Sequence, residues 1–143
     1  MVGKWLPKII LVLVTTFVGC SGAPNSHQYV RKSLDFVTRY LNSDAQSAEA
    51  ALLEWERYAL QCQQGGTKGV RFDQQFAAIY GRLSLVSKHL GKNDEAEDYF
   101  QKALDWSQRA SARDGRQKQT PEQVRSWIED LDRFVGVPLW KKK

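Results

Sequence analysis

The chain has 143 residues, of which 42% are hydrophobic and 26% charged, and its formal net charge is +5. This length suits one domain, and the composition excludes a disordered or fibrous chain. The charge identifies no partner class, because loss of a targeting segment with Lys4 and Lys8 would leave 19 basic and 16 acidic residues, an excess of only +3.

Residues 1–19 have the layout of an export signal. Lys4 and Lys8 lie in a basic stretch without acids, and residues 9–18, IILVLVTTFV, are uncharged and mostly apolar. Secretory signals have this order, with small residues at the cleavage site. Ten helical residues would extend about 15 Å, half of a ~30 Å hydrocarbon core, so we do not expect a stable transmembrane span.

The four residues Phe17-Val18-Gly19-Cys20 resemble the lipobox of bacterial lipoproteins. The resemblance implies cleavage after Gly19 and acyl chains such as palmitate on Cys20, which would anchor the protein in a membrane of the cell envelope. Two or more acyl chains hold a soluble domain durably, whereas one does not. In Gram-negative lipoproteins, a residue such as Ser21 after the cysteine implies the outer membrane, facing the periplasm. An uncleaved N-terminus and secretion with a free Cys20 remain alternatives.

Residues 20–26 are expected to form the lipidated cysteine and a flexible tether, and residues 27–136 a helical domain. Five segments of this domain repeat apolar residues at helical spacing, and none alternates with the period of a strand. The fold class predicted is all-α, with antiparallel helical hairpins and a C-terminal capping helix. The predicted apolar stripes are Val30, Leu34, Val37 and Leu41; Ala48, Ala51, Leu52, Trp55, Tyr58, Ala59 and Cys62; Phe76, Ile79, Tyr80, Leu83, Val86 and Leu90; Ala96, Phe100, Ala103 and Trp106; and Val124, Trp127, Ile128, Leu131 and Phe134.

Polar residues mark the expected starts of three of these helices. Asp73 and Asn93 are candidate N-caps of the third and fourth helices. Thr120-Pro121-Glu122-Gln123 combines a cap, a proline at the first helical position and a capping-box glutamine, which predicts the start of the fifth helix. Cys62 lies on an apolar stripe, so we expect it to be a buried thiol. Trp140, outside the stripes, is expected at the surface.

The segment Tyr80 to Leu104, YGRLSLVSKHLGKNDEAEDYFQKAL, is similar to a tetratricopeptide repeat. A large residue, a small residue, a turn glycine and a second helix of small and large residues follow in the family's order. A weaker echo of the pattern between Leu34 and Trp55 suggests two hairpins, with the fifth helix covering the exposed end. The resemblance implies a concave surface for partners made by the first helix of each pair. The positions carried over are Ala78, Gly81, Leu85, Lys88 and His89.

The sequence offers no pattern typical of catalysis, metal binding or cofactor binding. His27 and His89 are the chain's two histidines, and no histidine pair, Cys-x-x-Cys or serine elbow accompanies them. We therefore predict a protein that is not an enzyme and has neither catalytic nor metal-binding residues. Residues 137–143 form a basic tail in which Lys141, Lys142 and Lys143 could contact an anionic surface weakly. Nucleic acid is not an expected partner.

The function predicted from these observations is a membrane-anchored envelope lipoprotein that serves as a non-catalytic adaptor or assembly accessory. Its partner would be another envelope protein that binds the concave helix face. The alternative is an envelope enzyme or a regulator of a cell-wall enzyme.

Overall fold

The computed structural model describes residues 22–133 and residue 140. The predicted lipobox with Cys20, and the tail residues Lys141 to Lys143, lie outside these residues. The described part is all-α, without strands, which confirms the predicted fold class. Its helices are α1 Ser26–Asn42, α2 Ala45–Gln64, α3 Phe72–His89, α4 Asn93–Arg113 and α5 Pro121–Asp130.

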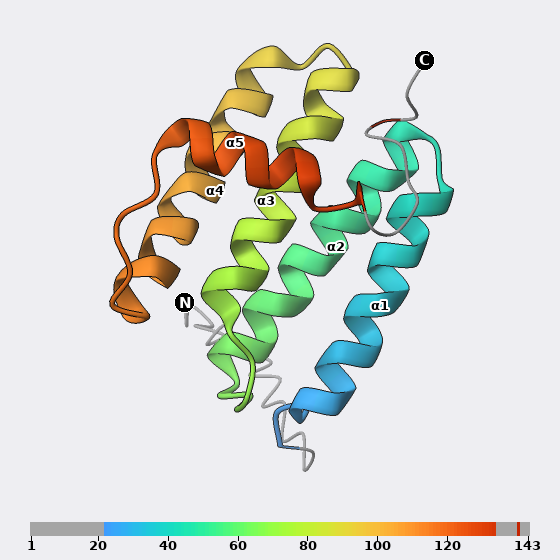
Figure 1. Ribbon diagram of the computed structural model, residues 1–143. Helices are drawn as coiled ribbons and strands as arrows, with labels where there is room; N and C mark the ends of the chain where they lie inside the picture. Colours follow the sequence, from blue (N-terminus) through green and yellow to red (C-terminus); the bar gives the residue numbers. More distant parts are fainter. Residues whose placement is uncertain (1–21, 134–139, 141–143) are drawn as a thin grey trace, which may run out of the picture.

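The helices α1 to α4 lie side by side in chain order, each antiparallel to the next (Figure 1). Two residues connect α1 to α2, and a short turn connects α3 to α4, so each pair is a helical hairpin. The predicted C-terminal helix is present: α5 runs across α3 and α4 at a steep angle (Figure 1). One face of the second hairpin is therefore covered by the chain's own C-terminal region.

Polar caps set the beginnings of several helices. The predicted capping box at Thr120 and Gln123 is confirmed, with Pro121 in the first turn of α5. Asn25 and Gln28 form a second capping box, at the start of α1.

The two predicted N-caps of the second hairpin are wrong. Asp73 lies inside α3, whose N-cap is Arg71, and its carboxylate accepts a bond from Arg113 instead. Asn93 is the first residue of α4, after the N-cap Lys92. The acidic residues of the first turns favour these helix starts without a side-chain cap.

Glycines end α2, α3 and α4 in the same way. Gly66, Gly91 and Gly115 follow the three C-caps with φ values of 80°, 76° and 66°. This left-handed conformation strains other residues and lets the next amide donate back to the last turn, as the Lys92 amide does to the Ser87 carbonyl at 2.9 Å. These glycines therefore fix where α2, α3 and α4 end.

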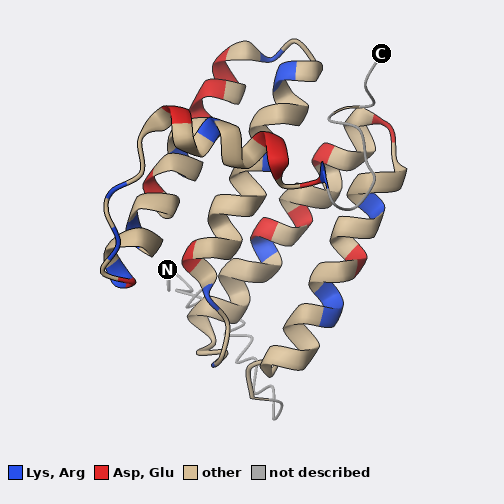
Figure 2. Cartoon of the chain, viewed as in Figure 1, with Lys and Arg blue, Asp and Glu red and all other residues tan. Residues whose placement is uncertain are grey.

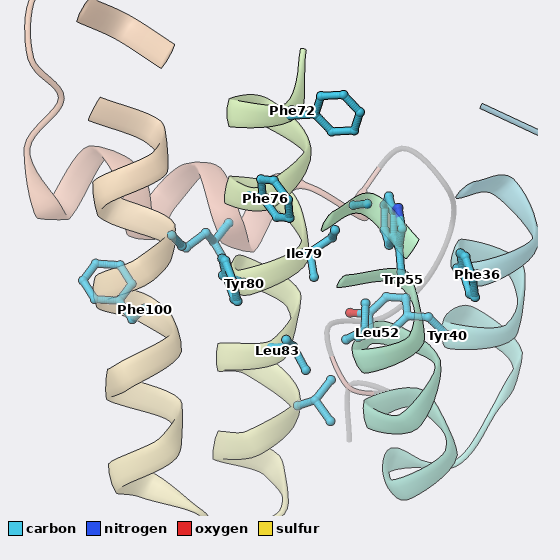
Figure 3. Packing of buried hydrophobic residues seen from close by; sticks show 14 of the residues in the cluster. Phe36, Tyr40, Leu52, Trp55, Phe72, Phe76, Ile79, Tyr80, Leu83 and Phe100 are labelled. Carbon is cyan, nitrogen blue, oxygen red and sulfur yellow. The ribbon is translucent and has the colours of Figure 1, made fainter. Parts of the chain in front are cut away.

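The core lies where α2 and α3 meet and extends to α1 and α4 (Figure 3). Leu52, Phe76, Ile79 and Leu83 are fully buried at its centre. Cys62 is buried as predicted, with 1% of its surface exposed. Trp140, expected at the surface, is half-buried and packs against this cluster.

The apolar stripe predicted for α1 is wrong by one residue. Val30 and Leu34 are 53% and 60% exposed, and Val37 and Leu41 are half-buried. The face that packs inward consists of Tyr29, Ser33, Phe36 and Tyr40. Aromatic rings bury more area than Val or Leu, so turning them inward removes more apolar surface from water. The Ser33 hydroxyl fits this face because it donates to the Tyr29 carbonyl at 2.8 Å.

Candidate functional site

The C-terminal region occupies part of the face that the sequence assigned to a partner. Gly81 is buried under α5, and a Cβ atom at this position would lie 2.8 Å from Cγ1 of Ile128. Carbon atoms cannot approach this closely, so the absence of a side chain at Gly81 lets α5 rest on α3. This predicted partner position is filled by the chain itself.

Beside Gly81, a crevice of about 320 Å³ lies between α5 and the second hairpin. Leu85 and Lys88 line it from α3, and Arg125 and Glu129 line it from α5. The Arg125 guanidinium lies over the Phe100 ring, 3.7 Å from its centroid. Two further predicted partner positions thus face a space bounded by the chain's own C-terminal helix.

A buried ion pair connects the end of α5 to α1 and α3. Arg82 donates from Nη2 and Nε to the same carboxylate oxygen of Asp132, at 2.9 and 3.0 Å, and the Tyr40 hydroxyl donates to the other oxygen at 3.0 Å. Side-chain exposure is 9% for Arg82 and 4% for Asp132. Burial, and then the charge of Asp132, raise the pKa of the Tyr40 phenol, so it stays a donor. Both carboxylate oxygens of Asp132 therefore accept hydrogen bonds within this buried cluster.

Trp140 lies next to the same cluster. Its ring packs edge-on against Tyr40, with centroids 5.5 Å apart, and lies 5.7 Å from the exposed His89 ring. His89 is the fourth predicted partner position that meets the C-terminal region. The fifth, Ala78, is half-buried on α3.

An open hollow remains between α1 and α3, at the end where both helices begin. We call it the α1–α3 trough; its volume is about 310 Å³. Val30 and Leu34 form its rim on α1, and Val70 and Gln75 lie on the other side. The full lining is Tyr29, Val30, Ser33, Leu34, Val37, Trp55, Gly69, Val70, Arg71 and Gln75.

Hydrogen bonds hold the floor of the trough in place. The Trp55 indole donates to the Tyr29 hydroxyl at 3.3 Å, and that hydroxyl donates to Oε1 of Gln75 at 3.3 Å. The Tyr29 ring also packs edge-on against Phe72, with centroids 5.4 Å apart. Because α1, α2 and α3 each contribute to this set, three helices build the floor of the trough.

Sequence reasoning missed the trough because it assigned Val30 and Leu34 to the core. The available signal was the second helical series of α1, from Tyr29 to Tyr40, which is offset by one residue and carries the larger side chains. Had that series been placed in the core, Val30 and Leu34 would have been left without a buried role.

The described residues hold no cluster of three or more His, Cys, Asp or Glu side chains placed to bind a metal ion. In the same part of the chain, no helix is both long enough and apolar enough to cross a bilayer. What the trough can do chemically is take up apolar side chains, with the Gln75 amide and the Arg71 guanidinium on one side.

Comparison of the chain with protein-family models, with curated proteins and with solved structures gave no match.

Proposed function

We propose that this chain is a lipid-anchored adaptor of a bacterial cell envelope, and that it binds a segment of another envelope protein in the α1–α3 trough. The observation that carries the proposal is the exposure of Val30 and Leu34 at the rim of an apolar hollow. Large exposed apolar side chains beside a hollow are characteristic of interaction sites.

The spacing of the rim residues favours a protein segment as the ligand. Val30, Leu34 and Val37 succeed one another at intervals of four and three on α1, and therefore form a continuous apolar edge along the helix. A helix or extended segment of a partner can place its own apolar side chains along such an edge. Gln75 and Arg71 offer polar groups for the backbone or acidic side chains of that segment.

Site-specific crosslinking in the native membrane tests the proposal. A photoreactive residue at Leu34 is expected to give one adduct of constant mass, whereas the same residue at Gln101, exposed on α4, gives none. The Val30→Glu variant should lose the Leu34 adduct while its unfolding midpoint stays unchanged, because position 30 is half exposed. No adduct from Leu34, or equal adducts from both positions, contradicts binding in the trough.

The anchor has a separate test. Intact mass of the natively expressed protein is expected to show a chain that begins at Cys20 with added acyl mass, and Cys20→Ala should leave the protein outside the membrane fraction. An unmodified full-length chain in the soluble fraction contradicts the anchor but leaves the trough open to other partners.

A further inference from the structure

One end of the helical domain gathers three segments that are distant in sequence. A Cβ atom on Gly65 would lie 3.3 Å from Cβ of Ala23, and one on Gly69 would lie 3.4 Å from Cβ of Ser26. The Arg71 guanidinium bridges to Asp114 at 2.6 Å. The start of α1, the connector from α2 to α3 and the end of α4 are therefore neighbours. We call residues 22–32, 63–73 and 109–120 the basic pole.

The basic pole has eight basic and two acidic residues. Both acids are already neutralised, because Asp73 accepts a bond from Arg113 at 3.0 Å and Asp114 accepts one from Arg71. Figure 2 shows lysine and arginine on the connector between α4 and α5, which starts at this end and runs back along α4, where Gln119 meets Ser107 and Gln108. The eight basic residues are Arg31, Lys32, Lys68, Arg71, Arg109, Arg113, Arg116 and Lys118.

The other end of the hairpins has the opposite charge. Residues 41–51 and 86–98, which we call the acidic pole, hold two basic and six acidic residues. A salt bridge of 2.9 Å between Lys92 and Glu49 joins its two segments. Helix α3 has 18 residues, about 27 Å of length, so the poles are separated by more than the ~8 Å Debye length of physiological salt. The acidic pole therefore does not cancel the field of the basic pole.

The surface of the basic pole is hollowed at two places. A hollow of about 520 Å³ at the end of α4 is lined by Asp105, Gln108, Arg109, Ala112, Arg116 and Lys118. A second one lies beside the N-terminal segment, where two basic residues, Arg31 and Lys32, and one acidic residue, Asp35, line it. Guanidinium and ammonium groups around a hollow suit the phosphate of a headgroup.

From these observations we infer that the basic pole is a docking surface for the anionic phospholipid headgroups of the membrane that holds the anchor. The inference rests on the proposed function. Cys20 precedes Gly22 by two residues, and two residues of chain reach at most about 7 Å, so an anchor there holds this pole at the membrane. Anchor and charge then act on the same end, and the helices stand upright with the acidic pole facing away.

The test measures which lysines the membrane protects. The natively acylated full chain is reconstituted into vesicles of phosphatidylcholine alone or with 30% phosphatidylglycerol, and a membrane-impermeant amine reagent is followed by peptide mass analysis. Lys68 and Lys118 are expected to react several-fold more slowly on anionic vesicles, whereas Lys88 at the acidic pole reacts equally on both. Protection should disappear in 0.5 M NaCl, because screening weakens headgroup contacts. Equal rates at both poles overturn the inference.

A variant pair supplies the matched control. Arg116→Glu reverses one charge of the basic pole at an exposed position, and Lys88→Glu makes the same reversal at the acidic pole. Each basic side chain near an anionic surface contributes about fivefold to partitioning. Arg116→Glu should therefore reduce the protection of Lys68, and Lys88→Glu should leave it unchanged. Equal effects of the two variants overturn the inference.

Two further measurements distinguish docking on headgroups from the acyl anchor alone and from binding of free phosphate. Flotation with phosphatidylcholine vesicles reports on the anchor alone: a chain that floats but whose Lys68 stays reactive on anionic vesicles overturns the docking surface and leaves the anchor standing. A chain that floats with neither vesicle overturns both. If inorganic phosphate protects Lys118 without vesicles as well as anionic vesicles do, the hollow of α4 is a site for free phosphate and the lipid assignment is wrong.

Discussion

The contact between Gly81 and Ile128 decides where α5 can lie. A methyl group at position 81 would meet Ile128 at 2.8 Å, so α5 has to shift or leave. Gly81→Val is expected to lower the free energy of unfolding by about 1–3 kcal/mol, the usual range for overpacking. In an Ile128→Ala background the same change should cost less, because the opposing side chain is gone. Urea unfolding of the wild type, the two single variants and the double variant measures the coupling free energy between positions 81 and 128. If the two single losses simply add in the double variant, the side chains at these positions are not in contact.

The Arg82–Asp132 pair holds the chain beyond α5 against α1 and α3. Asp132→Leu leaves the guanidinium buried without its counter-charge and is expected to destabilise the fold by about 3–5 kcal/mol. The double variant Arg82→Met/Asp132→Leu should recover most of this loss, because it removes both charges. Thermal unfolding of single and double variants provides the measurement. A double variant no more stable than Asp132→Leu alone would show that the pair itself is required.

Helix α1 shows why its inward face could not be read from periodicity. Helix α1 carries two apolar series with helical spacing. One is Val30, Leu34, Val37 and Leu41, and the other runs from Tyr29 to Tyr40. Periodicity alone allows either series to be the buried face. Side-chain area selects between them, since three aromatic rings outweigh two valines and two leucines. By contrast, the capping box of Thr120 was predictable, because all its bonds lie within four consecutive residues.

Two truncations on α1 test this register. Phe36→Ala should cost about 3–5 kcal/mol, because the ring is buried between α1 and α2 with 4% exposed surface. Leu34→Ala should change stability by less than ~0.5 kcal/mol, because the side chain is 60% exposed. Chemical denaturation of both variants gives the comparison. Similar losses at the two positions would return Leu34 to the core.

The position of α5 and of Trp140 depends on contacts across the whole molecule. Local patterns predict that the C-terminal helix exists. The residues that hold it in place, Gly81 and Arg82, lie on α3, about 40 to 50 residues earlier in the chain. The concave positions inferred from the repeat-like segment therefore could not reveal that the chain's own C-terminal region lies against four of the five, Gly81, Leu85, Lys88 and His89. The same argument explains the trough, which is the part of that face the C-terminal region leaves open.

All five tyrosines have raised pKa values in the folded protein, and burial is the first cause in each case. The pKa is raised from 10.0 to about 12 for both Tyr58 and Tyr80. The folded state holds its phenol protons more tightly than the unfolded state, so the stabilisation is complete below pH 10 and is lost as pH rises towards 12. We expect cooperative alkaline unfolding in this window.

Ultraviolet titration of tyrosinate checks this expectation. Absorbance should stay flat past pH 10 in buffer and then rise in one step together with the loss of helical circular dichroism. In 6 M guanidinium chloride it should rise near pH 10. Independent titration of the tyrosines near pH 10 with the helices intact would contradict the burial of these rings.

Cys62 makes the opening of the first hairpin accessible to measurement. With 1% of its surface exposed, its sulfur can react with an alkylating reagent only while the helices packed around it are transiently apart. The chain contains two cysteines, so acylation of Cys20 would leave Cys62 as the sole thiol, and no labelling site would have to be introduced. The rate of alkylation at rising reagent concentration would then give the free energy of that opening in the membrane-bound protein, and a partner seated against α1 would slow it in proportion to its affinity.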